Sequence, residues 1–104
     1  MASQYYIHRV SCKAHNKKTL ALCVALTRFN FSLITFWDGF TLDDMFSRLQ
    51  GIVKDINTKG KSREIEVRKS EYNDTVTFSF CEVPNNGETV ASFCLHPVIN
   101  YIDN

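Results

Sequence analysis

The chain has 104 residues, of which 44% are hydrophobic and 12% aromatic, so it has the size and composition of one domain with a packed core. This composition argues against disorder, because disordered chains are poor in aromatic and β-branched residues. Twelve Lys and Arg residues against eleven Asp and Glu residues give a formal net charge of +1, which excludes the general basic excess common in nucleic-acid-binding proteins. We therefore expect a single domain over residues 1–104.

The N-terminal residues and the cysteines indicate the cellular compartment. No basic start followed by an apolar run is present, so the sequence does not predict a signal peptide. The longest mostly apolar stretch, residues 20–26, is too short for a membrane span of about 20 residues. The four cysteines are widely spaced without a CxxC pair. We expect free thiols in a cytoplasmic protein, although an even number permits two disulfides.

The first forty residues carry the weaker patterns. Residues 4–13 alternate weakly, and residues 14–18 are typical of a turn. Residues 19–27 are apolar at nearly every position, as in a central strand covered on both sides or a short buried helix. The alternation of larger and smaller side chains there favours the strand. Residues 29–37 alternate again, which predicts another strand before a turn at Asp38-Gly39.

The clearest element is an amphipathic helix over residues 41–57. Its apolar residues recur at helical spacing and form one stripe: Leu42, Met45, Phe46, Leu49, Ile52, Val53 and Ile56. Thr41 is the expected N-cap, with Asp43 and Asp44 favourably placed at the positive end of the helix dipole. Gly60 is a natural left-handed stop. Such a one-sided helix needs a sheet to pack on.

A three-stranded antiparallel meander is predicted after the helix. Residues 62–70 form its first strand, with Ile65 and Val67 pointing inward. Asn86-Gly87 predicts a two-residue hairpin turn between the next two strands, so that Phe80 faces Phe93 and Phe78 faces Leu95. The fold class is therefore α+β: an antiparallel sheet of five to six strands in ββ(β)αβββ order, with one amphipathic helix packed on one face.

The other face of the meander is small and mostly polar, so we expect it to meet solvent or a partner. On the last two strands it carries Thr75, Thr77, Ser79, Cys81, Val83, Val90, Ser92, Cys94 and His96. Its charged flank comes from the preceding strand. The candidate binding residues are Glu64, Glu66, Arg68, Thr77, Ser79, Ser92 and His96.

Catalytic and metal-binding patterns are weak. The predicted register would let Cys81, Cys94 and His96 meet, and Cys12 lies close to His15, but neither spacing is that of a standard zinc finger or ribbon. Cys94 and His96 share a strand face, yet no nucleophile elbow or glycine-rich phosphate loop accompanies them. The sequence thus predicts no catalytic residue, no metal site and no cofactor.

Recognition by surface is the function that these patterns favour. We expect a small non-enzymatic protein-binding domain, of the inhibitor, antitoxin or immunity-protein type, that neutralises a toxin or enzyme by covering it. The alternative is a small nucleic-acid-binding or nuclease-like protein that uses the basic stretch from Lys59 to Lys69. Protein is the expected partner rather than nucleic acid or a membrane. A homodimer through an open sheet edge is a further possibility.

Overall fold

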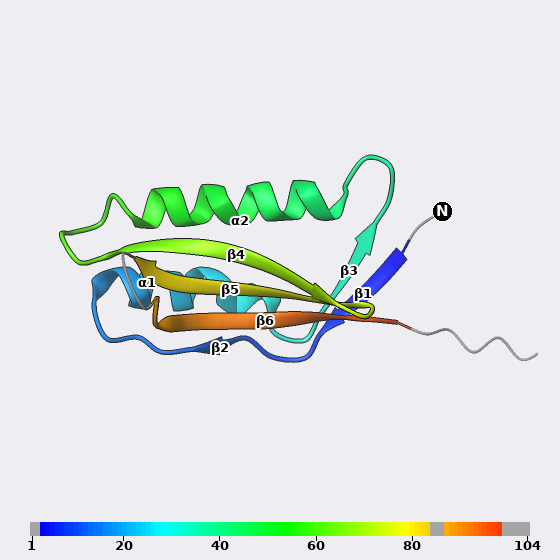
Figure 1. Ribbon diagram of the computed structural model, residues 1–104, viewed down its shortest axis with the longest axis horizontal. Helices are drawn as coiled ribbons and strands as arrows, with labels where there is room; N and C mark the ends of the chain where they lie inside the picture. The colour runs from blue at the N-terminus through cyan, green and yellow to red at the C-terminus, as the bar shows by residue number, and fades with distance from the viewer. Residues whose placement is uncertain (1–2, 84–86, 99–104) are drawn as a thin grey trace, which may run out of the picture.

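The computed structural model describes residues 3–83 and 87–98. Its elements are β1 (Ser3–Ile7), β2 (Ser11–Cys12), α1 (Lys17–Leu26), the 3-10 turn η1 (Thr27–Phe29), β3 (Ser32–Phe36), α2 (Leu42–Ile56), β4 (Glu64–Tyr72), β5 (Thr75–Val83) and β6 (Thr89–Pro97). The strands pair antiparallel in the order β3-β1-β6-β5-β4, and β2 pairs with β6 (Figure 1). The predicted α+β class, with a long amphipathic helix on an antiparallel sheet, is confirmed.

The helix α2 begins and packs as its sequence predicts. Thr41 Oγ1 accepts a hydrogen bond from the Asp44 N–H, and the Asp44 carboxylate accepts one from the Thr41 N–H at 2.8 Å. This reciprocal capping box satisfies two main-chain donors that the first turn would leave free. The stripe buries four residues in the core: Met45, Leu49, Val53 and Ile56. Gly60 has the expected positive φ of 86°.

The strand favoured for residues 19–27 is wrong, because this segment is the helix α1. Asn16 starts the helix with a capping box in which its side chain accepts from the Thr19 N–H at 2.9 Å and Thr19 Oγ1 accepts from the Asn16 N–H. Leu22 and Leu26, four residues apart, are fully buried on one side. A segment that is apolar all round has no distinct helical period, so its local caps decide its structure.

The predicted register of the β5–β6 hairpin is also wrong, by two residues. Phe78 lies opposite Phe93 instead of Leu95. The connection is longer than a two-residue turn, since the Glu82 N–H donates to the Glu88 carbonyl at 3.1 Å and closes the ladder there. A shift of two leaves side chains on the faces predicted for them, because the side-chain period of a strand is two.

An irregularity near the start of β6 changes one predicted face. The pairing shifts between Phe80 and Cys81, and Val90, expected on the polar face, is buried. A β-bulge gives one strand an extra residue and so redirects the neighbouring side chain. The predicted turn residue Asn86 lies outside the described residues.

Both helices cover the same face of the sheet. Phe46 of α2 stacks on Phe78 with ring centroids 6.0 Å apart, and Phe29 of η1 stacks on Phe93 at 5.5 Å. Phe78 is fully buried at the centre of this core. Neither helix packs on the opposite face of β4, β5 and β6, which we call the open face (Figure 1).

Cysteine pairing differs from the expectation. Cys12 of β2 and Cys23 of α1 form a disulfide across Cα atoms 5.7 Å apart, so the prediction of free thiols is wrong for this pair. The disulfide ties α1 to the strand that flanks β6. Cys81 and Cys94 are free, the first buried and the second half-buried. Over the described residues, no helix combines the length and the apolar character that crossing a membrane requires.

Candidate functional site

By strand alternation the seven candidate binding residues point away from the core, and two of them at the β4 edge, Glu64 and Glu66, also line a hollow between β4 and α2. Arg68, Ser79 and Ser92 are direct cross-strand neighbours on β4, β5 and β6, and such neighbours share a face. Arg68 is also engaged locally, since its guanidinium donates to the Glu66 carboxylate at 3.1 Å. At the far end, His96 lies opposite Tyr6 of β1. The predicted residues are therefore spread over three strands, β4, β5 and β6.

The metal and nucleophile candidates do not come together. In the observed register Cys94 lies opposite Thr77, with Cys94 Sγ 3.4 Å from Thr77 Oγ1, whereas Cys81 lies opposite Thr89. The predicted meeting of Cys81, Cys94 and His96 is wrong, because it required the shorter hairpin turn. Within residues 3–83 and 87–98, no group of three His, Cys, Asp or Glu side chains is placed to hold a metal ion.

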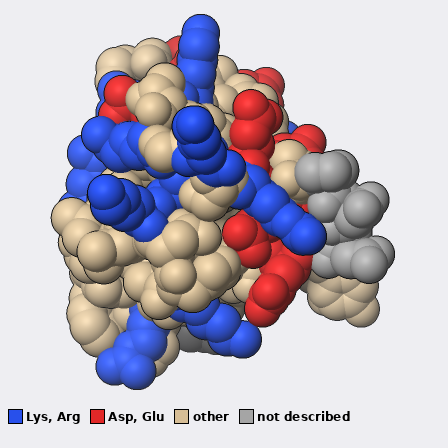
Figure 2. All heavy atoms as spheres, turned by 90° about the vertical axis from the view of Figure 1, so that its left-hand side faces the viewer, with Lys and Arg blue, Asp and Glu red and all other residues tan. Residues whose placement is uncertain are grey.

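The basic stretch is divided between different surfaces. Lys69 points to the helix side, where its Nζ lies 3.6 Å from an Asp43 carboxylate oxygen, while Arg68 lies on the open face. Lys59 and Lys61 belong to the loop after α2. Figure 2 shows Lys and Arg side chains gathered on this end of the molecule, with Asp and Glu side chains along one flank.

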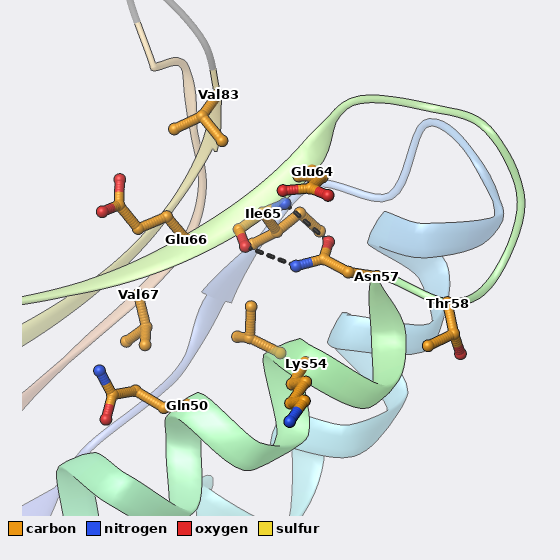
Figure 3. A pocket seen from close by; sticks show the side chains of 10 residues that line it. Gln50, Lys54, Asn57, Thr58, Glu64, Ile65, Glu66, Val67 and Val83 are labelled. Atoms are coloured by element: carbon orange, nitrogen blue, oxygen red, sulfur yellow. Dashed lines mark hydrogen bonds between the residues drawn. The ribbon is translucent and has the colours of Figure 1, made fainter.

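A hollow of about 780 Å³ lies between the end of α2 and β4 (Figure 3). Its central polar group, the Asn57 amide, donates to the Ile65 carbonyl at 2.9 Å and accepts from the Ile65 N–H at 2.8 Å. Lys54 and Glu64 also line the hollow. Because the Asn57 amide both donates to and accepts from the main chain of Ile65, it joins α2 to β4 and has a structural role.

Among the described residues the sheet ends at two edge strands: β4, which pairs with β5 alone, and β3, which pairs with β1 alone. At β3, the main-chain groups that face away from β1 can be identified. The Val98 N–H donates to the Gln4 carbonyl at 2.9 Å, so the main-chain groups of Gln4 point toward β6. Those of the next residue, Tyr5, then point toward β3. By the same alternation, the N–H and C=O groups of Leu33 and Thr35 point outward along the free edge.

The two edges of the sheet differ in charge. Residues 31–37 read Phe-Ser-Leu-Ile-Thr-Phe-Trp and carry none, while the other edge strand, β4, has charged side chains along most of its length. Charged side chains on an edge strand discourage pairing with a further strand, and an uncharged edge invites it. The β3 edge is therefore the one at which this sheet can be extended.

Beside this edge lies an exposed aromatic surface, which we call the β1–β3 patch: Tyr6, His8, Phe31 and Leu33. Tyr6 lies directly opposite Leu33, and the His8 ring contacts the Phe31 ring edge-on at 5.6 Å. Phe31 is 59% exposed and Leu33 57% exposed. A contiguous group of exposed apolar side chains is typical of an interaction site.

The backbone at Phe31 is in an unusual conformation. Its φ of 57° lies in the left-handed region, which a bulky L-residue enters at a cost of about 1–2 kcal/mol. Such residues occur more often at functional sites than elsewhere. Phe31 directly precedes β3, and its ring is exposed instead of buried in the core.

The sequence pattern predicted the strand β3 but not which of its faces is exposed. The alternation of residues 29–37 predicted the strand, yet alternation does not say which of two apolar faces is covered. Ile34 and Phe36 pack on the core, which leaves Leu33 on the open face. The absence of charge in residues 31–37 was the signal that could have marked the edge.

Comparison with known protein families, curated proteins and solved structures finds no match to this chain.

Proposed function

We propose that this chain is a non-enzymatic protein-binding domain of the inhibitor or immunity type, which neutralises a toxin or enzyme by adding a strand of that partner to β3. The observation that supports the proposal best is the uncharged free edge of β3 beside the β1–β3 patch. Together they offer main-chain hydrogen-bonding groups and apolar side chains on one continuous surface.

The two parts of this surface have different roles in the proposal. The outward main-chain groups of Leu33 and Thr35 provide hydrogen bonds that any extended strand can make. The exposed side chains of Tyr6, Phe31 and Leu33 select among such strands, because large apolar anchors contribute most of the binding free energy at interfaces. His96, opposite Tyr6, extends the surface onto the predicted polar face.

The experiment is affinity capture from cells that naturally contain the protein, with two edge variants. Leu33→Lys places a charge in the β1–β3 patch, and Thr35→Pro removes an outward N–H, a position at which edge strands accept proline. Ser70→Lys on β4 is the matched control, since it is exposed on the open face of the opposite edge strand. A partner retained by the native chain and Ser70→Lys but lost from both edge variants supports the proposal.

The same variants distinguish the alternatives, in affinity capture and in sedimentation of the purified protein. A partner that both edge variants retain would show that β3 is not the binding site. Recovery of nucleic acid, in an amount that falls steeply with salt because counterions are released, would favour the alternative based on Lys59 and its neighbours. A native chain that sediments as a dimer, and as a monomer once Leu33→Lys is introduced, would make a second copy of this chain the occupant of the edge.

A cytoplasmic location stays part of the proposal. The disulfide between Cys12 and Cys23 is the observation against it, because cytosolic proteins seldom keep structural disulfides. Alkylation of the protein in its native cells before lysis counts its free thiols and decides between the two compartments.

A further inference from the structure

A groove of about 530 Å³ runs between α1 and α2, on the helical side of the molecule. Its lining comes from both helices: Lys17, Leu20, Ala21, Val24 and Ala25 on one side, and Ile52, Asp55, Ile56 and Lys59 on the other. The spacing of three and four residues in both sets means that each helix presents one continuous stripe. Two such stripes side by side form the seat into which a third helix packs.

After Lys17, the α1 stripe is apolar although it faces outward. Leu20 is 56% exposed and Val24 64% exposed, while Leu22 and Leu26 on the inner side are fully buried. The helix is thus apolar on both sides, and only one side is covered by the core. Exposed apolar side chains that border a groove are typical of a binding surface.

Positive charge lies at one end of this groove. Lys17 begins α1 and Lys59 follows α2, and the only carboxylate in the lining is Asp55. Lys18 Nζ donates to the Ser62 carbonyl at 2.7 Å, which fixes the loop after α2 against the start of α1. The cations that gather on this end are visible in Figure 2. The opposite end of the groove is lined by apolar side chains such as Val24 and Ala25.

We propose that this groove binds an amphipathic helix of another protein, with acidic side chains beside Lys17 and Lys59 and apolar side chains on Leu20 and Val24. The α1 stripe extends from Lys17 to Ala25, a length of roughly 12 Å, which matches two to three turns of a partner helix. Helices bind in such grooves through apolar residues at i, i+3, i+4 and i+7. This surface is separate from the β3 edge, so the inference does not depend on the proposed function.

The test uses two synthetic peptides of about 14 residues, a length that forms helices on binding. They share one apolar face and differ only in having Glu or Lys at the flanking polar positions. In calorimetric titrations at low ionic strength, the Glu peptide should bind at least about tenfold more tightly than the Lys peptide. Added salt should reduce this difference, because the charges are exposed and screened.

Variants of the protein test whether the peptides bind in the groove between α1 and α2. The double variant Lys17→Glu with Lys59→Glu should reverse the preference between the peptides. Val24→Asp should abolish binding of both, and circular dichroism checks that it is folded. The control is the double variant Arg9→Glu with Lys54→Glu, which makes the same change in net charge at exposed residues outside the groove lining and should keep the native preference.

Several outcomes would overturn the proposal. Equal affinities for the two peptides, or a preference that survives in the Lys17 and Lys59 double variant, would show that these cations do not select the ligand. Tighter binding to phosphatidylserine vesicles or to single-stranded DNA than to the Glu peptide, lost in Val24→Asp, would assign the surface to a membrane or a nucleic acid. Self-association abolished by Val24→Asp would assign it to a second copy of the chain.

Discussion

Asn57 joins α2 to β4, and its replacement should have a large and pH-dependent effect on stability. Its amide makes two hydrogen bonds to the main chain of Ile65, a residue only 2% exposed (Figure 3). Each bond contributes about 1 kcal/mol, and an unpaired buried partner adds to the loss. Asn57→Ala should therefore lower the free energy of unfolding by about 2–3 kcal/mol, which corresponds to a fall of roughly 10–20 °C in Tm for a domain of this size.

The variant Asn57→Asp tests the direction of these bonds. Its carboxylate can accept from the Ile65 N–H but cannot donate to the Ile65 carbonyl, so folding raises the pKa of the introduced carboxyl above its unfolded value of about 3.9. A raised pKa means that the stability is retained below the unfolded pKa and is lost as the pH rises through the folded pKa. Relative to the native chain, the variant should be clearly less destabilised at about pH 3.5 than at about pH 7.

Urea unfolding followed by circular dichroism measures both variants. Gln50→Ala is the control, because Gln50 lines the same hollow and is exposed on α2; it should change stability by less than about 0.5 kcal/mol. A comparably small effect of Asn57→Ala would refute the reasoning. So would a penalty for Asn57→Asp that is the same at both pH values.

Three further predictions concern the cap, the disulfide and the core. Hydrogen bonds from the Thr41 N–H and hydroxyl lower the pKa of Asp44. The contribution of Asp44 to the free energy of unfolding is therefore present above the unfolded pKa and is lost as the pH falls through the folded pKa. Acid titrations should show that the stability advantage of the native chain over Asp44→Asn disappears at low pH. Reducing the disulfide, which spans 11 residues of sequence, should cost about 3 kcal/mol. Alkylation of the unfolded chain should modify two thiols without reductant and four thiols with reductant. Modification of four thiols under both conditions would exclude the disulfide. Phe78→Ala should cost about 3–5 kcal/mol by thermal or urea unfolding, whereas Tyr72→Ala, at an exposed site, should stay within about 0.5 kcal/mol; similar losses would contradict the assigned core.

The elements predicted correctly are those whose signals are local. The helix α2 has a one-sided apolar stripe and its own cap at Thr41, and both are legible in consecutive residues. β4 likewise alternates clearly between Ile65 and Val67 inside and charged residues outside. These patterns do not depend on what the rest of the chain does, because they follow from the periods of helix and strand.

Apart from α1, whose capping box joins Asn16 and Thr19 only three residues apart, the features that were missed depend on contacts between different elements. The disulfide requires Cys12 and Cys23 to meet, which happens only because α1 is a helix that packs beside β2. The register of β5 and β6 depends on the length of their connection, and Asn-Gly is a strong turn signal that does not exclude a longer loop. The surfaces proposed for binding were missed for the same reason, since exposure of Val24 or Leu33 is decided by neighbours that sequence does not show.

Trp37 follows β3 directly and is 57% exposed, with its ring beside Gly39 in the turn that returns to α2. It is the only tryptophan of the chain, so its emission comes from a single place in the molecule. A strand added along β3 would remove water from the indole and shift that emission to shorter wavelength, whereas a ligand between α1 and α2 would leave it unchanged. The fluorescence of Trp37 should therefore report binding at the β3 edge and not binding between α1 and α2.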